Sequence, residues 1–188
     1  VLSSRPENPV DPRLTGVLPG EREFVKEFPG AELASSMLAR SLERLGQAVA
    51  TSVSAVWRQH GLSHAAGNAL AVIEGAHGSV TPGEISASMH ITSGSITSLL
   101  DTLEKKHLIR RDSHADDRRK VSVTITTAGT DLLDAALPAI QMLVKQAFSD
   151  FTASERAELL GLVAKAYTAV TALDLTDLPT GTRNRPPR

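Results

Sequence analysis

Apolar residues recur every three or four positions along most of the chain, which is the pattern of amphipathic helices. The first stripe runs from residue 32 to residue 60 and predicts one long helix that ends at Gly61. A second helix is expected over residues 63–74, and two long helices are expected after residue 126, the first with Pro138 inside it. The first stripe consists of Leu38, Leu42, Leu45, Val49, Val53 and Val56.

The middle of the chain carries two shorter helical segments. Segment 81–89 begins with an N-terminal cap at Thr81, a proline at the first helical position, and Glu84 where a capping box needs an acid. After a three-residue break, residues 93–106 are expected to form the second helix. Two helices joined by a tight turn are typical of a helix-turn-helix, although two core helices of any small bundle give the same pattern. The inward-facing residues of the second helix are Ile96, Leu99, Leu100 and Leu103.

An alternating run of apolar and polar residues follows the second helix at once. Residues 109–112 are expected to form a short strand, residues 120–125 the return strand, and residues 114–119 the tip between them. The predicted fold is therefore mainly α-helical with a small β-hairpin wing, a winged helix-turn-helix. The alternation places three residues on one face, against the helices: Val121, Val123 and Ile125.

Positive charge is concentrated on this hairpin. The chain of 188 residues has a formal net charge of −1, so affinity for nucleic acid requires a local basic patch. The helix before the hairpin opens with short hydroxyl side chains, which can contact phosphates or base edges. A solvated charged hairpin is the alternative interpretation. The basic residues are Lys105, Lys106, Arg110, Arg111, Arg118, Arg119 and Lys120, and the hydroxyl residues are Ser93, Ser95, Thr97 and Ser98.

Several other chemistries find no support in the residues. The chain has no cysteine, which excludes thiol redox sensing, thiolate metal sites and disulfides. No His, Asp and Glu cluster has the spacing of metal ligands, and no nucleophile motif or glycine-rich phosphate loop is found, so we predict no metal, no cofactor and no enzymatic activity. No apolar run approaches the roughly 20 residues of a membrane span, and we expect no signal peptide, no membrane partner and a cytoplasmic location.

The stretch from Met89 to Gly129 resembles the multiple antibiotic resistance regulator (MarR) family of bacterial transcription factors. The wing signature of that family is Asp-x-Arg, a β run, and then Leu-Thr-x-x-Gly. Here it reads Asp117-Arg118-Arg119 followed by KVSVTITTAG, with isoleucine in place of the leucine. The segment that ends in LLDTLEKKHLIRR is similar to the recognition helix of the family. The resemblance covers residues 62–133, and the flanking helices fit by order and length.

The resemblance implies an obligate homodimer in which the long first helix and the last two helices interlock. The two recognition helices would enter successive major grooves of a pseudo-palindromic operator in double-stranded DNA. Arg119 of each wing would enter a flanking minor groove, held in position by a salt bridge from Asp117. The implied organisation is a helical dimerisation region (31–61 and 127–175) and a DNA-binding lobe (62–126). The prolines and glycines at the two ends of the chain separately predict a flexible N-terminal arm (1–30) and a flexible tail (176–188).

The ligands of the family are usually small aromatic or phenolic anions that bind between the dimer helices and the winged lobe. The resemblance therefore implies a repressor that such a ligand releases from DNA. For Trp57, simple core packing is the alternative role, and surface positions suit the histidines equally well. The candidate ligand-binding residues in this chain are Trp57, His60, His64 and Asn68.

The chain also departs from the family pattern. Many relatives have Arg or Lys where Ser98 and Thr102 stand, so this recognition helix offers fewer phosphate contacts. A dimeric protein-interaction regulator with weakened specific DNA binding is therefore the alternative function. The family commonly has glycine where His107 stands, and a non-glycine residue there requires a left-handed or adjusted backbone. Thr130 replaces an arginine of the urate-responsive members, so urate is not assigned.

Overall fold

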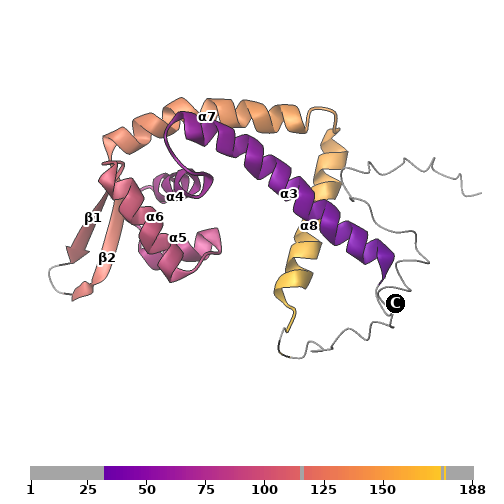
Figure 1. Ribbon diagram of the computed structural model, residues 1–188, viewed down its shortest axis with the longest axis horizontal. Coiled ribbons are helices and arrows are strands. Elements are labelled where there is room, and N and C mark those ends of the chain that lie inside the picture. The colour runs from indigo at the N-terminus through magenta and orange to yellow at the C-terminus, as the bar shows by residue number, and fades with distance from the viewer. Residues whose placement is uncertain (1–31, 115–116, 175, 177–188) are drawn as a thin grey trace, which may run out of the picture. The chain divides into compact units, whose positions relative to one another are not determined.

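The computed structural model describes residues 32–114, 117–174 and 176, so the predicted arm of residues 1–30 and nearly all of the predicted tail lie outside the described residues. The described part contains six helices and one two-stranded antiparallel sheet (Figure 1). This arrangement confirms the predicted fold class, mainly α-helical with a β-hairpin wing that follows a helix-turn-helix. Contacts group the chain into one unit up to Leu143 and a second unit from Val144.

The first described helix, α3 (Leu33–Gln59), is the long helix that the apolar stripe predicts. It ends where Gly61 adopts a φ of +71°, a left-handed conformation that is free of steric cost only for glycine. The next helix, α4 (His64–Gly75), begins at the Ser63 hydroxyl, which accepts a hydrogen bond from the backbone N–H of Ala66. Both predicted helices are confirmed, and the observed ends differ from the predicted ones by one residue.

The helix that follows, α5 (Pro82–Met89), is held by the predicted capping box. The Thr81 hydroxyl accepts a hydrogen bond from the backbone N–H of Glu84 at 3.2 Å, and the Glu84 carboxylate accepts one from the backbone N–H of Thr81 at 2.8 Å. These two bonds satisfy backbone donors that the first helical turn otherwise leaves without partners. The cap therefore explains why so short a helix begins where it does.

A tight turn joins α5 to α6 (Ser93–Lys105), as a helix-turn-helix requires. His90 closes α5 with a φ of 53°, in the left-handed region. The Ser86 hydroxyl donates to the backbone carbonyl of Ile91 at 2.6 Å, which links the last turn of α5 to the connecting segment. These local bonds set the direction in which α6 leaves the turn.

The wing is formed by β1 (Ile109–His114) and β2 (Asp117–Ile125), which pair antiparallel. The predicted strand ends were wrong, because both strands extend into the stretch 114–119 that was expected to be the tip. Charged residues do not end a strand in a hairpin that leaves one face in water. The register jumps between Val121 and Asp117, so residues 118–120 have no Cα partner in β1.

A further extended residue, which the periodicity does not predict, joins the hairpin. Val80 donates its backbone N–H to the carbonyl of Val123 at 3.0 Å, and Val123 donates back at 2.8 Å. Val80 directly precedes the cap of α5, and the Val123 side chain is fully buried. This bridge therefore fixes the start of the helix-turn-helix to the second strand of the wing.

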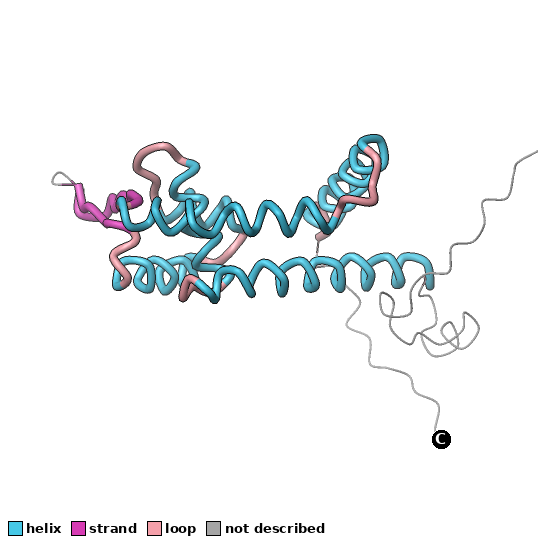
Figure 2. Tube along the Cα trace, turned by 90° about the horizontal axis from the view of Figure 1, so that it is seen from above, coloured by secondary structure: helices cyan, strands magenta, loops and turns pink. Residues whose placement is uncertain are grey.

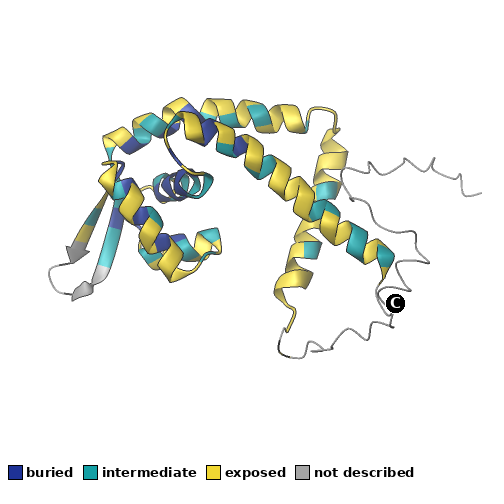
Figure 3. Ribbon diagram, viewed as in Figure 1, coloured by how far each residue is buried: buried dark blue, intermediate teal, exposed yellow. Residues whose placement is uncertain are grey.

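The hydrophobic core lies among the C-terminal half of α3, α4, α5, α6 and β2, as the dark residues of Figure 3 show. Three of the four α6 residues predicted to face inward are buried, and Leu99 is half-buried. Val123 is buried as predicted, with Val121 and Ile125 half-buried beside it. The largest fully buried side chains are Trp57, Leu70, Ile73, Ile85, Ile96, Leu100, Leu103, Val123 and Leu133.

Two helices follow the wing. The first, α7 (Thr127–Ala147), contains Pro138 and contributes Leu133 and Ala136 to the core. The second, α8 (Ala153–Thr171), starts at a capping box but has no buried residue. Among the described helices, none is both long and apolar enough to cross a membrane.

Candidate nucleic-acid interface

The helix α6 separates an apolar face from a polar one. Ile96, Leu100 and Leu103 point into the core and are at most 2 % exposed. The other face is open to solvent, and all four hydroxyl residues that the sequence singles out are exposed on it: Ser93, Ser95, Thr97 and Ser98. The position of these residues is thus a direct consequence of the apolar spacing.

The four hydroxyls differ in the hydrogen bonds that they already make. Thr97 Oγ1 donates to the carbonyl of Ser93 at 3.0 Å, and Ser95 Oγ lies 2.9 Å from Thr92 Oγ1. Within the described part of the chain, the hydroxyls of Ser93 and Ser98 make no hydrogen bond. These two serines can therefore donate to a partner, whereas Thr97 presents its methyl group and acceptor lone pairs.

The wing residues Asp117, Arg118 and Arg119 lie on β2, next to the register jump. An irregularity of this kind bends a strand and redirects its side chains. Figure 2 shows the hairpin extending away from the helices of the same unit. The side chains of residues 113–120 lie outside the described residues, so the salt bridge between Asp117 and Arg119 stays a prediction.

One basic residue of the patch contacts α6 rather than solvent, which sequence reasoning missed. Arg111 on β1 donates from Nη2 to Asp101 Oδ1 at 2.7 Å, and its Nε lies 3.5 Å from Glu104 Oε2. The same Nη2 atom lies 3.5 Å from the carbonyl of Thr97. Asp101 and Glu104 are three positions apart, so they share one face of α6. This spacing of two acids was the feature of the sequence that could have indicated a basic partner for that face.

The junction between α6 and the wing is sterically demanding. His107 has a φ of 59°, as the substitution of the usual glycine predicts. Its carbonyl accepts a hydrogen bond from the Thr126 hydroxyl at 2.7 Å. A Cβ atom on Gly129 would lie 2.2 Å from the carbonyl oxygen of Leu108, so only glycine fits at the end of the wing signature.

The candidate ligand residues do not converge on one pocket. Trp57 is 1 % exposed and packs on Gly67, where a Cβ atom would lie 2.2 Å from the indole ring. Trp57 is therefore a core residue, as the alternative interpretation held. The His64 ring lies 3.0 Å from the Asn68 amide nitrogen, so these two residues do contact one another.

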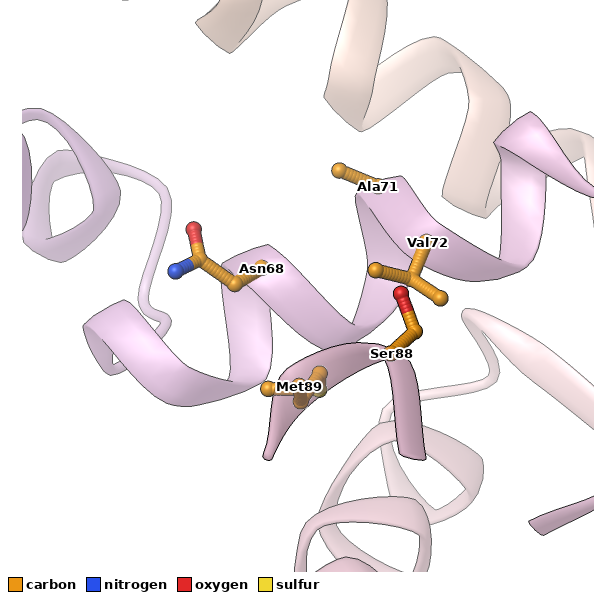
Figure 4. A pocket seen from close by; sticks show the side chains of 5 residues that line it. All are labelled: Asn68, Ala71, Val72, Ser88 and Met89. Carbon is orange, nitrogen blue, oxygen red and sulfur yellow. The ribbon is translucent and has the colours of Figure 1, made fainter. Parts of the chain in front are cut away.

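Two separate hollows flank this pair. The first, of about 520 Å³, is lined by His64 together with Ser54, Arg58 and residues 61–63. The second, of about 490 Å³, lies between α4 and α5 and is shown in Figure 4. Its lining residues are Asn68, Ala71, Val72, Ser88 and Met89. His60 lines neither hollow, and no group of metal-ligating side chains is found in the described residues.

Comparison with known proteins finds a family match for the middle of the chain and similar transcriptional regulators. The MarR family model matches residues 73–121, from the end of α4 to β2. The transcriptional regulator PapX of Escherichia coli is 26% identical over 143 residues, which cover 75% of this chain and 86% of PapX. The transcriptional repressor MdtR of Bacillus subtilis (strain 168) is 26% identical over 135 residues, which cover 72% of this chain and 86% of MdtR.

The fold is also similar to that of solved structures. A mutant of MarR from Escherichia coli, in complex with operator DNA, aligns with a TM-score of 0.65 at 24% identity. The alignment covers 72% of this chain and 99% of that chain. The likeness extends beyond the segment that the family model matches, since residues 73–121 are a smaller share of the chain than the alignment covers.

Proposed function

Because the chain belongs to the MarR family of transcriptional regulators, we propose that it is a homodimeric repressor that binds a pseudo-palindromic operator in double-stranded DNA. The observation that carries this proposal is the pairing of two features. An exposed polar face of α6 adjoins the hairpin on which the chain concentrates its basic residues. Such a helix can enter a major groove while the hairpin reaches the adjacent minor groove.

The proposed contacts to DNA divide by groove. In the major groove, the free hydroxyls of Ser93 and Ser98 donate to phosphates or base edges, and Ser95 and Thr97 line the same face. In the minor groove, Arg118 and Arg119 of β2 approach the bases, with Asp117 orienting Arg119. Two similar proteins support DNA binding by a repressor in general: MdtR is named a repressor, and the Escherichia coli MarR mutant was solved in complex with operator DNA.

The proposed dimer uses the regions 31–61 and 127–175 and accounts for apolar residues that the described part of the chain leaves exposed. On α3, Leu38 is 58% exposed, and on α8 Leu160 is 71% exposed. A soluble chain rarely leaves so many large apolar side chains in water without a partner for them. The winged lobe of residues 62–126 completes each half of the proposed assembly. A second copy is the simplest partner, because a pseudo-palindrome requires two lobes.

We further propose that a small aromatic or phenolic ligand releases the repressor from DNA. The polar groups that support this step are His60, His64 and Asn68, on or next to α3 and α4. His64 lines the hollow that also contains Arg58, whose guanidinium suits an anionic ligand. Trp57 would not contact the ligand, since its side chain is buried against Gly67 of α4.

Fluorescence anisotropy tests the DNA-binding proposal. The probe is a labelled duplex from the region upstream of the gene itself, titrated at several salt concentrations against a scrambled duplex. We expect tight binding that prefers the native duplex and weakens steeply with salt. Arg119→Ala should lose about tenfold in affinity or more, whereas Arg58→Ala, which removes one positive charge at the end of α3, should change it little. Unchanged binding of Arg119→Ala would show that the wing assignment is wrong.

A dimeric regulator that acts through protein partners is the second candidate function. Neutral residues favour it, since Ser98 and Thr102 stand where many relatives have Arg or Lys. The Thr102 hydroxyl also donates to the carbonyl of Ser98 at 3.0 Å and has no proton left for a phosphate. Weak binding without preference for the native duplex in the anisotropy experiment would favour this candidate over the repressor.

A further inference from the structure

The surface that α6 presents to solvent carries an electrostatic problem for a DNA-binding helix. Asp101 and Glu104 lie on it with side chains that are 50% and 44% exposed. A carboxylate next to a phosphate backbone is repelled, and like charges brought together at an interface weaken binding. A helix that approaches DNA with two uncompensated carboxylates would therefore lose affinity.

The guanidinium of Arg111 meets both carboxylates. It forms a 2.7 Å ion pair with Asp101 and a 3.5 Å ion pair with Glu104, while Nη2 also lies 3.5 Å from the Thr97 carbonyl. Its side chain is only 22% exposed, and its Nε atom is shielded from solvent with no hydrogen bond within the described residues. Partial burial strengthens these ion pairs relative to surface pairs.

The location of Arg111 adds a geometric consequence. The residue lies in the third position of β1, where it pairs with Val123 across the hairpin, and Val123 is anchored in the core. The side chain therefore reaches from the wing to the middle of α6. The hairpin and this helix, which Figure 1 shows next to one another, are the two elements proposed to enter adjacent grooves. The positive charge of Arg111 thus lies against the two carboxylates of α6.

We propose that Arg111 supports DNA binding by neutralising Asp101 and Glu104 on the recognition helix, whose carboxylates would otherwise repel the phosphates. The inference rests on the proposed function, because it concerns the affinity for DNA. It assigns Arg111 no contact with DNA, in contrast to Arg118 and Arg119. Its guanidinium is already engaged by two carboxylates and a carbonyl of the chain itself.

A set of three variants tests the proposal with the same duplex and salt series. Arg111→Ala should weaken binding about tenfold or more, because two carboxylates then face the phosphates uncompensated. Adding Asp101→Asn and Glu104→Gln to that variant should restore affinity to within about threefold of wild type, since the repelling charges are gone. Asp101→Asn with Glu104→Gln alone should bind at least as tightly as wild type.

Rescue by the neutral substitutions separates neutralisation from direct contact. Loss of a phosphate contact lowers the slope of log affinity against log salt by about one, and removing the carboxylates of Asp101 and Glu104 does not restore such a contact. A lower slope for Arg111→Ala, together with no rescue by the two neutral substitutions, would overturn the proposal. Weaker binding of Asp101→Asn with Glu104→Gln would overturn it as well, and this variant alters only half-exposed side chains, so it is usable even if Arg111→Ala does not fold.

The wild-type titration keeps this proposal distinct from the proposed function. If wild-type protein shows no preference for the native duplex, the repressor assignment fails before any variant is compared. If wild type binds as expected and Arg111→Ala binds equally tightly, the repressor assignment stands and the role of Arg111 is refuted. Thermal melting of each variant, followed by circular dichroism, establishes that the affinities compare folded proteins.

Discussion

The winged lobe and the helix α8 are built from similar residues but differ in what those residues contact. In α4, Leu70 and Ile73 are fully buried, whereas in α8 Leu160 is 71% exposed and Val170 is 66% exposed. Both regions use the same N-terminal device, since α5 and α8 each begin with a complete capping box. Helix formation is thus encoded locally, whereas burial depends on a partner, and for α8 the described part of the chain does not provide one.

Charges placed on the exposed apolar face of α8 should have the largest effect in this comparison. Leu160→Glu with Val170→Glu should convert the proposed dimer to single chains, because an ionised carboxylate in an apolar interface has no compensating partner. Sedimentation velocity measures the mass, and Glu158→Gln on the same helix is the control that should remain dimeric. A dimer that survives both charges would place the interface elsewhere, and the contrast between the two regions would lose its explanation.

One glycine-to-alanine substitution in each region tests the same difference in packing, by adding a methyl group instead of a charge. Gly67→Ala should destabilise the protein by about 1–3 kcal/mol, because the added methyl group would overlap the Trp57 ring in a filled core. Gly161→Ala in α8 should stabilise it by about 0.5–1 kcal/mol, since nothing lies within 4 Å of the added atom and alanine favours the helix. Urea unfolding measures both, and equal effects of the same sign would contradict the difference in packing.

The sequence predicted features that local spacing determines. The capping box at Thr81 and the inward face of α6 each follow from residues within a few positions of one another. These predictions are confirmed because caps and apolar periodicity act within a single turn or element. The left-handed backbone at His107 was expected instead from the family resemblance, because the family commonly has glycine at that position.

Features that depend on contacts between elements were not predictable in the same way. The bridge from Val80 to Val123 joins residues far apart in the chain, and the ion pair of Arg111 with Asp101 requires the register of the hairpin on α6. The candidate ligand residues were inferred from the family resemblance, with core packing as the alternative role of Trp57. Only the close approach of Gly67 from another helix determines that the Trp57 indole is enclosed.

Backbone strain provides a smaller effect that is specific to the lobe. Among the described residues, the non-glycine residues with positive φ are His77, His90 and His107, and all three lie in the lobe. His107→Gly should stabilise the protein by about 1 kcal/mol, because glycine adopts the left-handed region without a steric penalty. Lys106→Gly, at a φ of −89°, should instead destabilise it. A lower unfolding midpoint for His107→Gly would mean that the histidine side chain stabilises the folded state by more than its left-handed backbone destabilises it.

The smallest expected effect is a pH dependence that distinguishes the two capping boxes. The backbone N–H of Thr81, and then its hydroxyl, donate to the Glu84 carboxylate at 2.8 Å each, and these bonds lower the pKa of Glu84 below its usual value. The same arrangement with Thr152 lowers the pKa of Glu155 at the start of α8. A carboxyl with a lowered folded-state pKa stabilises the folded state at a pH above its unfolded pKa, and this stabilisation is lost as the pH falls through the folded pKa.

Glu84→Gln should therefore lower the urea midpoint of the lobe at neutral pH. Its difference from wild type should shrink as the pH falls below the unfolded pKa of glutamate, about 4.3, and through the lowered pKa of the folded state. Glu155→Gln should leave that midpoint unchanged and reduce the helical signal of α8 instead, because α8 has no buried residue through which to couple to a core. If both variants shift the midpoint of the lobe equally, the two regions unfold as one cooperative unit, and the partner that buries α8 must also hold the lobe.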